Sequence, residues 1–172
     1  ERIADVPEAS LPVLPPRNAD SWQDLWYEEA GGVGYLGFDF HNGAMSTQDC
    51  LRLRDAFVAA TKRGTRVIAL MGGADFWSNG IHLNLIEAAE SPADESWRNI
   101  VAMDDLCQAI LECDTHLTIA AMRGNAGAGG VFLALAWRLR ADLSRARAGL
   151  LFHYSLLYLA LLFVAMAVDP LL

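Results

Sequence analysis

The stretches WSNGIHLN (77–84) and GNAGAGG (124–130) both place glycine where an apolar run gives way to a helical pattern. Backbone N–H groups at such a turn have no partner inside the helix, and the helix dipole favours negative charge there. If the amides of Ile81 and Gly129 converge, they form an oxyanion hole whose donors are worth roughly 3 kcal/mol each in a transition state. Glycine beside each amide allows a ligand to approach the backbone closely.

Other uses of glycine-rich turns fit these residues less well. GNAGAGG is not followed by the Gly-Lys-Ser/Thr of a P-loop, and Val131 and Phe132 stand where a dinucleotide-binding turn would have its last glycine. A nucleotide-phosphate site is therefore a weak interpretation. The remaining alternative is that each turn is only a tight connection, because most glycine-rich turns bind nothing.

Two side chains beside the first turn can carry protons. His82 follows the Ile81 amide and could touch a substrate, although a histidine in this position more often hydrogen-bonds its own loop. Glu87 lies one turn into the next helix and could act as an acid or base if it were buried. The alternative for Glu87 is a solvated helix face.

The elements that would position these residues alternate between strand and helix. Strands are predicted over 33–40, 66–73 and 116–122 from short apolar runs bounded by glycine. Ser46, with Asp49 three residues later, predicts a capping box that starts a helix reaching Lys62. Further helices are predicted over 83–89, after a polar break at 90–96, and from about Gly129. This order predicts the α/β class.

Composition restricts the class of partner. Thirteen Lys and Arg stand against 21 Asp and Glu, which gives a formal net charge of −8, and the sequence pI is about 4.8. Such a chain lacks the basic surface of a nucleic-acid binder, so no nucleic acid is expected as a partner. Cys50, Cys107 and Cys113 have no metal-ligand spacing and predict reduced core residues of a cytoplasmic protein, with no metal.

Both ends of the chain differ from its middle. The first 21 residues hold four of the six prolines, and residues 1–30 are predicted to form a linker or extended arm. At the other end, residues 149–172 are almost wholly apolar, with 13 consecutive apolar or aromatic residues over 156–168. This segment of uncertain status is interpreted as buried or as a sequence error, and the alternative is a membrane anchor preceded by four arginines.

The two glycine stretches resemble the signatures of a known superfamily. ADFWSNGIHLNLIE and MRGNAGAGGVFLALA are similar to the two signatures of the crotonase (enoyl-CoA hydratase/isomerase) superfamily, and NGAMS is similar to the turn before its first helix. The resemblance covers about 31–148. It implies a ββα spiral, truncated at the C-terminus, because the helices that complete the family's pocket and trimer are missing.

The resemblance also implies site residues. A coenzyme A thioester would be bound with its carbonyl oxygen at the Ile81 and Gly129 amides. The CoA track would be lined by the backbone around Ala44, Ser78, Asn79 and Gly80. Within the superfamily, the chain most resembles the C-terminal domain of HoxX-type hydrogenase maturation proteins, which implies a preceding formyl-tetrahydrofolate-binding domain. The activity implied is a lyase reaction in which formyl-CoA releases CO for a [NiFe]-hydrogenase.

The sequence departs from the hydratases of the superfamily at their two catalytic glutamates. The first would fall at Phe132, which cannot transfer a proton, and no glutamate occurs after Glu112. Two-glutamate hydration is therefore not expected. An apolar pocket would instead protect formyl-CoA from water. His153 and Tyr154 fall near the place where the family's later catalytic residue arrives, so Tyr154 is a further candidate.

Two other functions stay open at this point. The chain could be a generic enoyl-CoA hydratase/isomerase family member, or a noncatalytic CoA-binding or interaction domain that has lost its acid and base. Self-association into a homo-oligomer also stays open. Turnover of a thioester would separate an enzyme from a binding domain.

Overall fold

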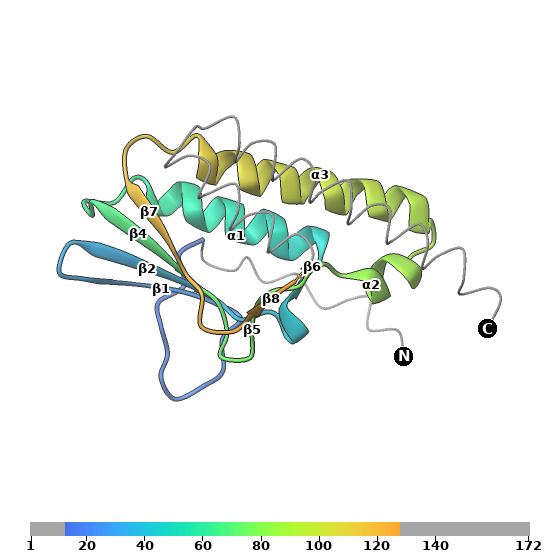
Figure 1. Cartoon of the computed structure of the whole chain (residues 1–172), viewed down its shortest axis with the longest axis horizontal. Coiled ribbons are helices and arrows are strands. Elements are labelled where there is room, and N and C mark those ends of the chain that lie inside the picture. Colours follow the sequence, from blue (N-terminus) through green and yellow to red (C-terminus); the bar gives the residue numbers. More distant parts are fainter. Residues whose placement is uncertain (1–12, 128–172) are drawn as a thin grey trace, which may run out of the picture.

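The structure is a computed structural model, and it describes residues 13–127. Its centre is a four-stranded mixed sheet in the order β1-β2-β4-β7 (Figure 1). The strands β2, β4 and β7 run parallel, whereas β1 is antiparallel to β2. The strands are β1 (Leu25–Ala30), β2 (Val33–Phe38), β4 (Val67–Met71) and β7 (Leu117–Ala121).

Two long helices lie side by side along the sheet, and a short one lies beyond its end (Figure 1). They are α1 (Thr47–Ala60), α3 (Pro92–Leu111) and the short α2 (Leu83–Glu87). Helix α1 begins where predicted, because the Ser46 Oγ accepts from the Asp49 amide while the Asp49 carboxylate accepts from the Ser46 amide. This reciprocal capping box satisfies two amides that the helix itself leaves unpaired.

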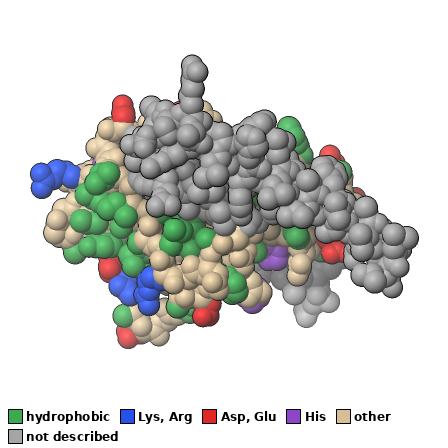
Figure 2. Space-filling model, in the orientation of Figure 1, with side chains coloured by type: hydrophobic (Ala, Val, Ile, Leu, Met, Phe, Trp, Pro, Cys, Tyr) green, Lys and Arg blue, Asp and Glu red, His purple; other side chains and the backbone are tan. Residues whose placement is uncertain are grey.

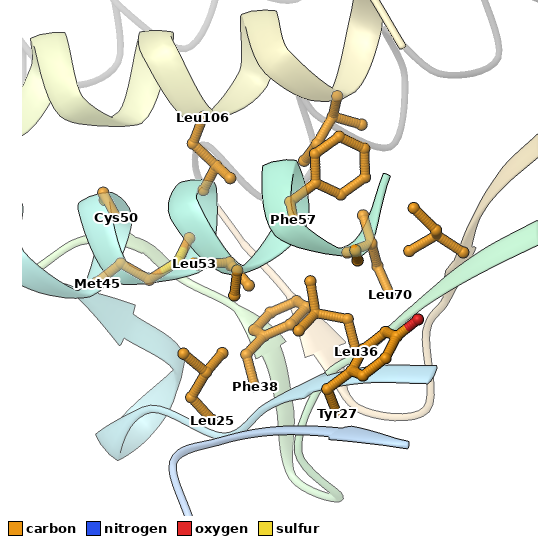
Figure 3. Packing of buried hydrophobic residues seen from close by; sticks show 14 of the residues in the cluster. Leu25, Tyr27, Leu36, Phe38, Met45, Cys50, Leu53, Phe57, Leu70 and Leu106 are labelled. Atoms are coloured by element: carbon orange, nitrogen blue, oxygen red, sulfur yellow. The ribbon is translucent and has the colours of Figure 1, made fainter. Parts of the chain in front are cut away.

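One hydrophobic core fills the space between the sheet and α1 (Figure 3). Leu36 and Phe38 from β2 and Leu70 from β4 meet Leu53 and Phe57 of α1, and all five are buried. The alternation of burial along β2 follows from the strand period of two residues, which turns every second side chain to the helix layer. The core therefore fixes the register of the parallel strands, and with it the level at which their carboxyl ends stop.

The opposite face of the sheet carries apolar side chains as well. In β7, Leu117 and Ile119 are 63% and 43% exposed, and they align with Val67 and Ala69 of β4. Figure 2 shows hydrophobic side chains gathered over the strands at this side of the molecule.

Three sequence predictions need correction. The arm predicted over 1–30 is wrong for its last part, because β1 belongs to the sheet and buries Leu25 and Tyr27. The polar break predicted over 90–96 is shorter, because α3 already begins at Pro92, a residue suited to a helix start. Four two- or three-residue strands were not predicted: β3 (Ala44–Met45), β5 (Phe76–Ser78), β6 (Gly80–Ile81) and β8 (Asn125–Ala126).

The remaining element predictions are confirmed within a few residues. The predicted strands over 33–40, 66–73 and 116–122 correspond to β2, β4 and β7, and the predicted helix over 83–89 corresponds to α2. Cys50 and Cys113 are buried and Cys107 is partly buried. Burial raises the pKa of the Cys50 thiol to about 12, which keeps it protonated. The helix predicted near Gly129 lies outside the described residues.

Asp24 and Arg52 join the segment before β1 to α1, and this ion pair gives a test of the fold. Arg52 donates to both carboxylate oxygens of Asp24, at 2.7 and 2.9 Å. This hydrogen bonding, opposed by burial, holds the pKa of Asp24 below its ordinary 3.8. Asp24→Asn should therefore lower the free energy of unfolding by about 1 kcal/mol at pH 7, since the pair is partly exposed.

The sign of the pH dependence follows from the lowered pKa. The stabilisation is present above the unfolded-state pKa and disappears as pH falls through the folded-state pKa, below 3.8. Urea unfolding from pH 7 down to pH 2.5 should bring the wild type and Asp24→Asn together at the acid end. Asp55→Asn, which removes a more exposed partner of Arg54, is the matched control. A gap between wild type and Asp24→Asn that persists unchanged into acid would contradict the role of Asp24.

Candidate functional site

Two pairs of very short strands gather the candidate residues at the carboxyl end of the main sheet (Figure 1). Strand β3 pairs in parallel with β6, so that Met45 faces Ile81. Strand β5 pairs in parallel with β8, so that Phe76 faces Asn125 and Ser78 faces Ala126. Residues around 44, 80 and 126, far apart in sequence, therefore form one region.

The Ile81 amide is directed away from β3. In a parallel strand pair, the carbonyl of a hydrogen-bonded residue accepts from the backbone amide on the partner strand that follows the directly opposite residue. Met45 does this, because its carbonyl accepts from the His82 amide at 3.0 Å. Ile81, the residue opposite Met45, therefore turns its own N–H and C=O to the other side. Its N–H is left available for a group outside the β3–β6 pair.

Gly80 and Ser78 form the bend that turns the chain at this point. Gly80 has a φ of +84°, a backbone conformation that glycine adopts without the penalty a side chain brings. Its N–H donates to the Oγ of Ser78 at 3.2 Å, and Ser78 is buried. The Gly80 amide is thus satisfied internally by the Ser78 hydroxyl.

The second glycine stretch lies directly against the first. The Gly127 amide donates to the Ser78 carbonyl at 2.8 Å, and the Asn125 amide donates to the Asp75 carbonyl at 2.9 Å. Gly124 packs so closely that a Cβ on it would lie 2.5 Å from the Phe76 amide nitrogen. The two turns therefore converge as far as Gly127. Gly129 comes two residues later and lies outside the described residues, as do Phe132, His153 and Tyr154.

Trp77 anchors the loop from below. Its side chain is 1% exposed and meets the Phe38 ring edge-on, with 5.5 Å between ring centroids. A Cβ on Gly72 would lie 2.6 Å from the Trp77 Cα, so this glycine lets the end of β4 approach the loop. The Trp77 indole packs between the sheet and the loop and so determines how far residues 78–81 lie from the hydrophobic core.

His82 serves its own loop, which was the alternative interpretation from the sequence. Its amide bonds to Met45, and its Nδ1 accepts from the Leu85 amide at 3.4 Å as the N-cap of α2. This use of Nδ1 as acceptor places the proton of the neutral ring on Nε2. Glu87, the other predicted acid or base, is exposed on α2, as expected for a solvated helix face.

Two features of the described residues bear on other kinds of site. Within residues 13–127 there is no group of three or more His, Cys, Asp or Glu that could hold a metal ion. In the same part of the chain, no helix is both long and apolar enough to span a bilayer. The predicted apolar segment over 149–172 lies outside the described residues.

The turn before β3 lies in the stretch NGAMS, where a turn was predicted, and the structure adds its backbone geometry and its contacts. Asn42 has a left-handed backbone with φ of +54°, and Gly43 follows at φ of +68°. The Gly43 carbonyl accepts from the Asn79 amide at 2.7 Å. The dipeptide Asn-Gly was a usable signal for this geometry, since both residues tolerate positive φ. Its contact with Asn79, 37 positions away, had no signal in the sequence.

The comparisons with known proteins agree on one group. The hydrogenase maturation factor HoxX of Bradyrhizobium diazoefficiens is 56% identical over 133 residues, which cover 77% of this chain and 24% of HoxX. The crystal structure of HypX from Aquifex aeolicus in complex with tetrahydrofolic acid superposes with a TM-score of 0.67 and 54% identity, over 70% of this chain and 22% of HypX. This chain is a HoxX/HypX homologue. It spans about a quarter of the length of these relatives.

The HoxX-like chain also shares its fold with crotonases. A putative enoyl-CoA hydratase/isomerase (crotonase) from Legionella pneumophila matches with a TM-score of 0.57 and 27% identity, over 67% of this chain and 46% of that one. The predicted crotonase-like α/β fold is thereby confirmed. No protein-family model matches the chain.

A second, shorter match concerns a different protein. Protoheme IX farnesyltransferase of Roseiflexus castenholzii is 63% identical over 41 residues, which cover 24% of this chain and 8% of that protein. The two matched lengths, 133 and 41 residues, nearly equal the 172 residues of the HoxX-like chain when taken together.

The close packing of Gly124 yields a prediction. Gly124→Ala forces a Cβ against backbone atoms of Asp75 and Phe76 that cannot rotate away. We expect the free energy of unfolding to fall by about 1–3 kcal/mol, as overpacking usually costs. Gly64→Ala is the control, because a Cβ on Gly64 meets nothing within 4 Å. Equal stability of the two variants in urea unfolding would contradict the observed contact between β5 and β8.

Proposed function

We propose that the HoxX-like chain binds the acyl group of a coenzyme A thioester, with the carbonyl oxygen accepting from the Ile81 and Gly129 amides. The observation that carries this proposal is the direction of the Ile81 N–H, which points away from β3 because Met45 bonds to His82 instead. The Gly127 amide bonds to the Ser78 carbonyl. Gly129, whose amide is the proposed second donor, follows two residues later in the same glycine stretch. Two fixed amides facing one oxygen are the usual means of stabilising a thioester oxyanion.

The CoA part of the ligand would follow the backbone on either side of this amide. Ala44 and Gly80 face each other in the β3–β6 pair, and Ser78 and Asn79 precede the bend. A role of this kind suits exposed carbonyl and amide groups more than charged side chains. The Gly80 amide is already bonded to Ser78, so Gly80 would contribute close approach and not a donor.

For the reaction, we propose the chemistry implied by HoxX-type proteins. Formyl transfer from formyl-tetrahydrofolate to the CoA thiol would give formyl-CoA and tetrahydrofolate. Formyl-CoA would then lose CO as its carbon–sulfur bond breaks, and the formyl hydrogen would pass as a proton to the departing thiolate. Support comes from the name hydrogenase maturation factor for HoxX and from the tetrahydrofolic acid bound by HypX. A folate-binding domain preceding this chain in the full-length protein, and a cytoplasmic location, are part of the proposal.

Within residues 13–127, the predicted proton carriers are His82 and Glu87. His82 commits Nδ1 to the α2 cap, so only its Nε2 could face a ligand. Glu87 is exposed, and Tyr154 remains a candidate from the sequence alone. This arrangement of His82 and Glu87 within residues 13–127 favours decarbonylation over hydration, because water need not be activated when the formyl proton goes to the thiolate. It also favours the second candidate, a CoA-binding domain without catalysis.

The first experiment is a calorimetric titration with CoA and short acyl-CoAs. The wild type should bind, and Gly129→Val should weaken acyl-CoA binding about tenfold or more, because a side chain there would block the carbonyl oxygen. Gly64→Val is the control, since Gly64 borders open space. If the wild type binds, formyl-CoA is assayed next for release of CO. A folded wild type that binds no acyl-CoA would contradict the proposal.

We propose that the 41-residue farnesyltransferase match falls on the last part of the chain, including the apolar segment 149–172, so that it overlaps the end of the crotonase resemblance over 31–148. The support is that the two matched lengths together account for the length of the chain and that residues 149–172 are almost wholly apolar. The chain would then join residues of two ancestries near the second glycine stretch, and the membrane interpretation would concern only the later part.

A single peptide tests this junction. Trypsin would release residues 124–138, GNAGAGGVFLALAWR, between Arg123 and Arg138. If the two parts are one polypeptide, mass spectrometry of source-cell proteins should detect this peptide. Detection only of peptides on either side, with HoxX-like sequence continuing past Gly130, would show that the two parts belong to separate proteins.

A further inference from the structure

Asn79 connects three segments that surround the Ile81 amide. Its backbone N–H donates to the Gly43 carbonyl at 2.7 Å. Its side-chain Nδ2 donates to the carbonyl of Asn42, also at 2.7 Å. Its Oδ1 faces the second glycine stretch, because a Cβ on Gly127 would lie 3.1 Å from it. Asn79 thus makes two hydrogen bonds to the turn before β3 and also lies against the second glycine stretch.

The turn that Asn79 holds has a left-handed backbone at Asn42. Asn42 is the one non-glycine residue between 13 and 127 with a positive φ, at +54°. Asparagine tolerates this conformation better than most residues, but glycine adopts it at lower cost. Asn42 is exposed, so core packing does not hold it. Backbone hydrogen bonds hold the turn locally, from the Gly43 amide to the Phe40 carbonyl and from the Ala44 amide to the His41 carbonyl. The bond from the Asn79 side chain to the Asn42 carbonyl is the side-chain contact that adds to them.

The turn at Asn42 and Gly43 also determines the position of β3. Asn42 and Gly43 lead directly into β3. In β3, the Met45 carbonyl accepts from the amide of His82, the residue that follows Ile81. A shift of β3 would change this bond and rotate the Ile81 N–H. We propose that the Asn79 side chain is a positioning residue, whose amide fixes the Asn42 turn and thereby the direction of the Ile81 N–H. This inference rests on the proposed thioester function of the site.

The chemistry of an amide is what the position requires. Aspartate at position 79 would keep the shape of asparagine and an oxygen toward Gly127, but it would place a second oxygen against the Asn42 carbonyl. Alanine would leave that carbonyl to water and the turn without its side-chain support. Asn79→Asp therefore removes one donated hydrogen bond with little change of volume.

The test compares two ligands that differ only at the carbonyl. Acetyl-CoA carries the thioester oxygen, whereas S-ethyl-CoA is a thioether without it. Asn79→Asp should weaken acetyl-CoA binding roughly fivefold more than S-ethyl-CoA binding, as expected for one neutral hydrogen bond, because any effect of the added charge on the CoA track is common to both ligands. Asn84→Asp, an exposed asparagine on α2, is the matched control for the added charge and should change neither.

A rescue variant separates the turn from other effects. Asn79→Ala should show the same selective loss of acetyl-CoA binding as Asn79→Asp. Adding Asn42→Gly should restore most of it, because glycine adopts the left-handed conformation without support. Thermal unfolding of each variant checks that the chain remains folded at the temperature of titration.

The outcomes distinguish this inference from the proposed function. Wild-type binding of acetyl-CoA no tighter than of S-ethyl-CoA would overturn the proposed function, and the inference with it. Selective wild-type binding with equal losses for both ligands in Asn79→Asp, or with no loss, would overturn the role of Asn79 alone. Failure of Asn42→Gly to rescue Asn79→Ala would show that Asn79 does not act through the Asn42 turn.

Discussion

The parallel pairing of β3 with β6 is the constraint on which the candidate site depends. Each strand of the pair is two residues long, yet the register decides which amide forms a hydrogen bond within the pair and which points out of it. Because the Met45 carbonyl takes the His82 amide, the Ile81 N–H turns outward. A slip of one residue would exchange these roles, and the outward amide would belong to a neighbour.

The surrounding structure holds that register from several directions. Trp77 packs beneath the loop against Phe38, and the buried Ser78 satisfies the Gly80 amide. The capping box of Ser46 starts α1 immediately after β3. These contacts come from the main sheet, the loop itself and the first helix. The short pair therefore has a fixed position although two residues on their own would not form a stable sheet.

The same arrangement explains why a HoxX/HypX homologue can share a crotonase fold and differ from hydratases in its side chains. The elements that the described residues place around Ile81 are backbone elements, and they tolerate replacement of the acid and base. By the superfamily resemblance, the first glutamate of hydration would fall at Phe132, and no glutamate follows Glu112; the β3–β6 and β5–β8 pairs contain neither position. The proposed decarbonylation makes use of such a site, since it needs a held carbonyl and little water.

The sequence by itself determined the local features of this protein. Apolar runs bounded by glycine predicted β2, β4 and β7, the Ser46–Asp49 spacing predicted the start of α1, and the glycine signatures predicted the superfamily and the candidate amide of Ile81. These features follow from residue type and short-range spacing, which act within a few positions. The sequence did not predict β1, because its apolar and acidic residues follow a proline-rich start and become a strand only by pairing with β2.

Only the tertiary structure decided which groups meet at the site. The contacts of Asn79 with Asn42, and of Gly127 with Ser78, join residues dozens of positions apart. Pairs as short as β3–β6 have no periodic pattern to read. Which short strands pair depends on where the strands of the main sheet end and on their register, and both depend on how the whole core packs. The hydrogen bond from Asn79 to the Asn42 carbonyl and the outward direction of the Ile81 amide exist for that reason.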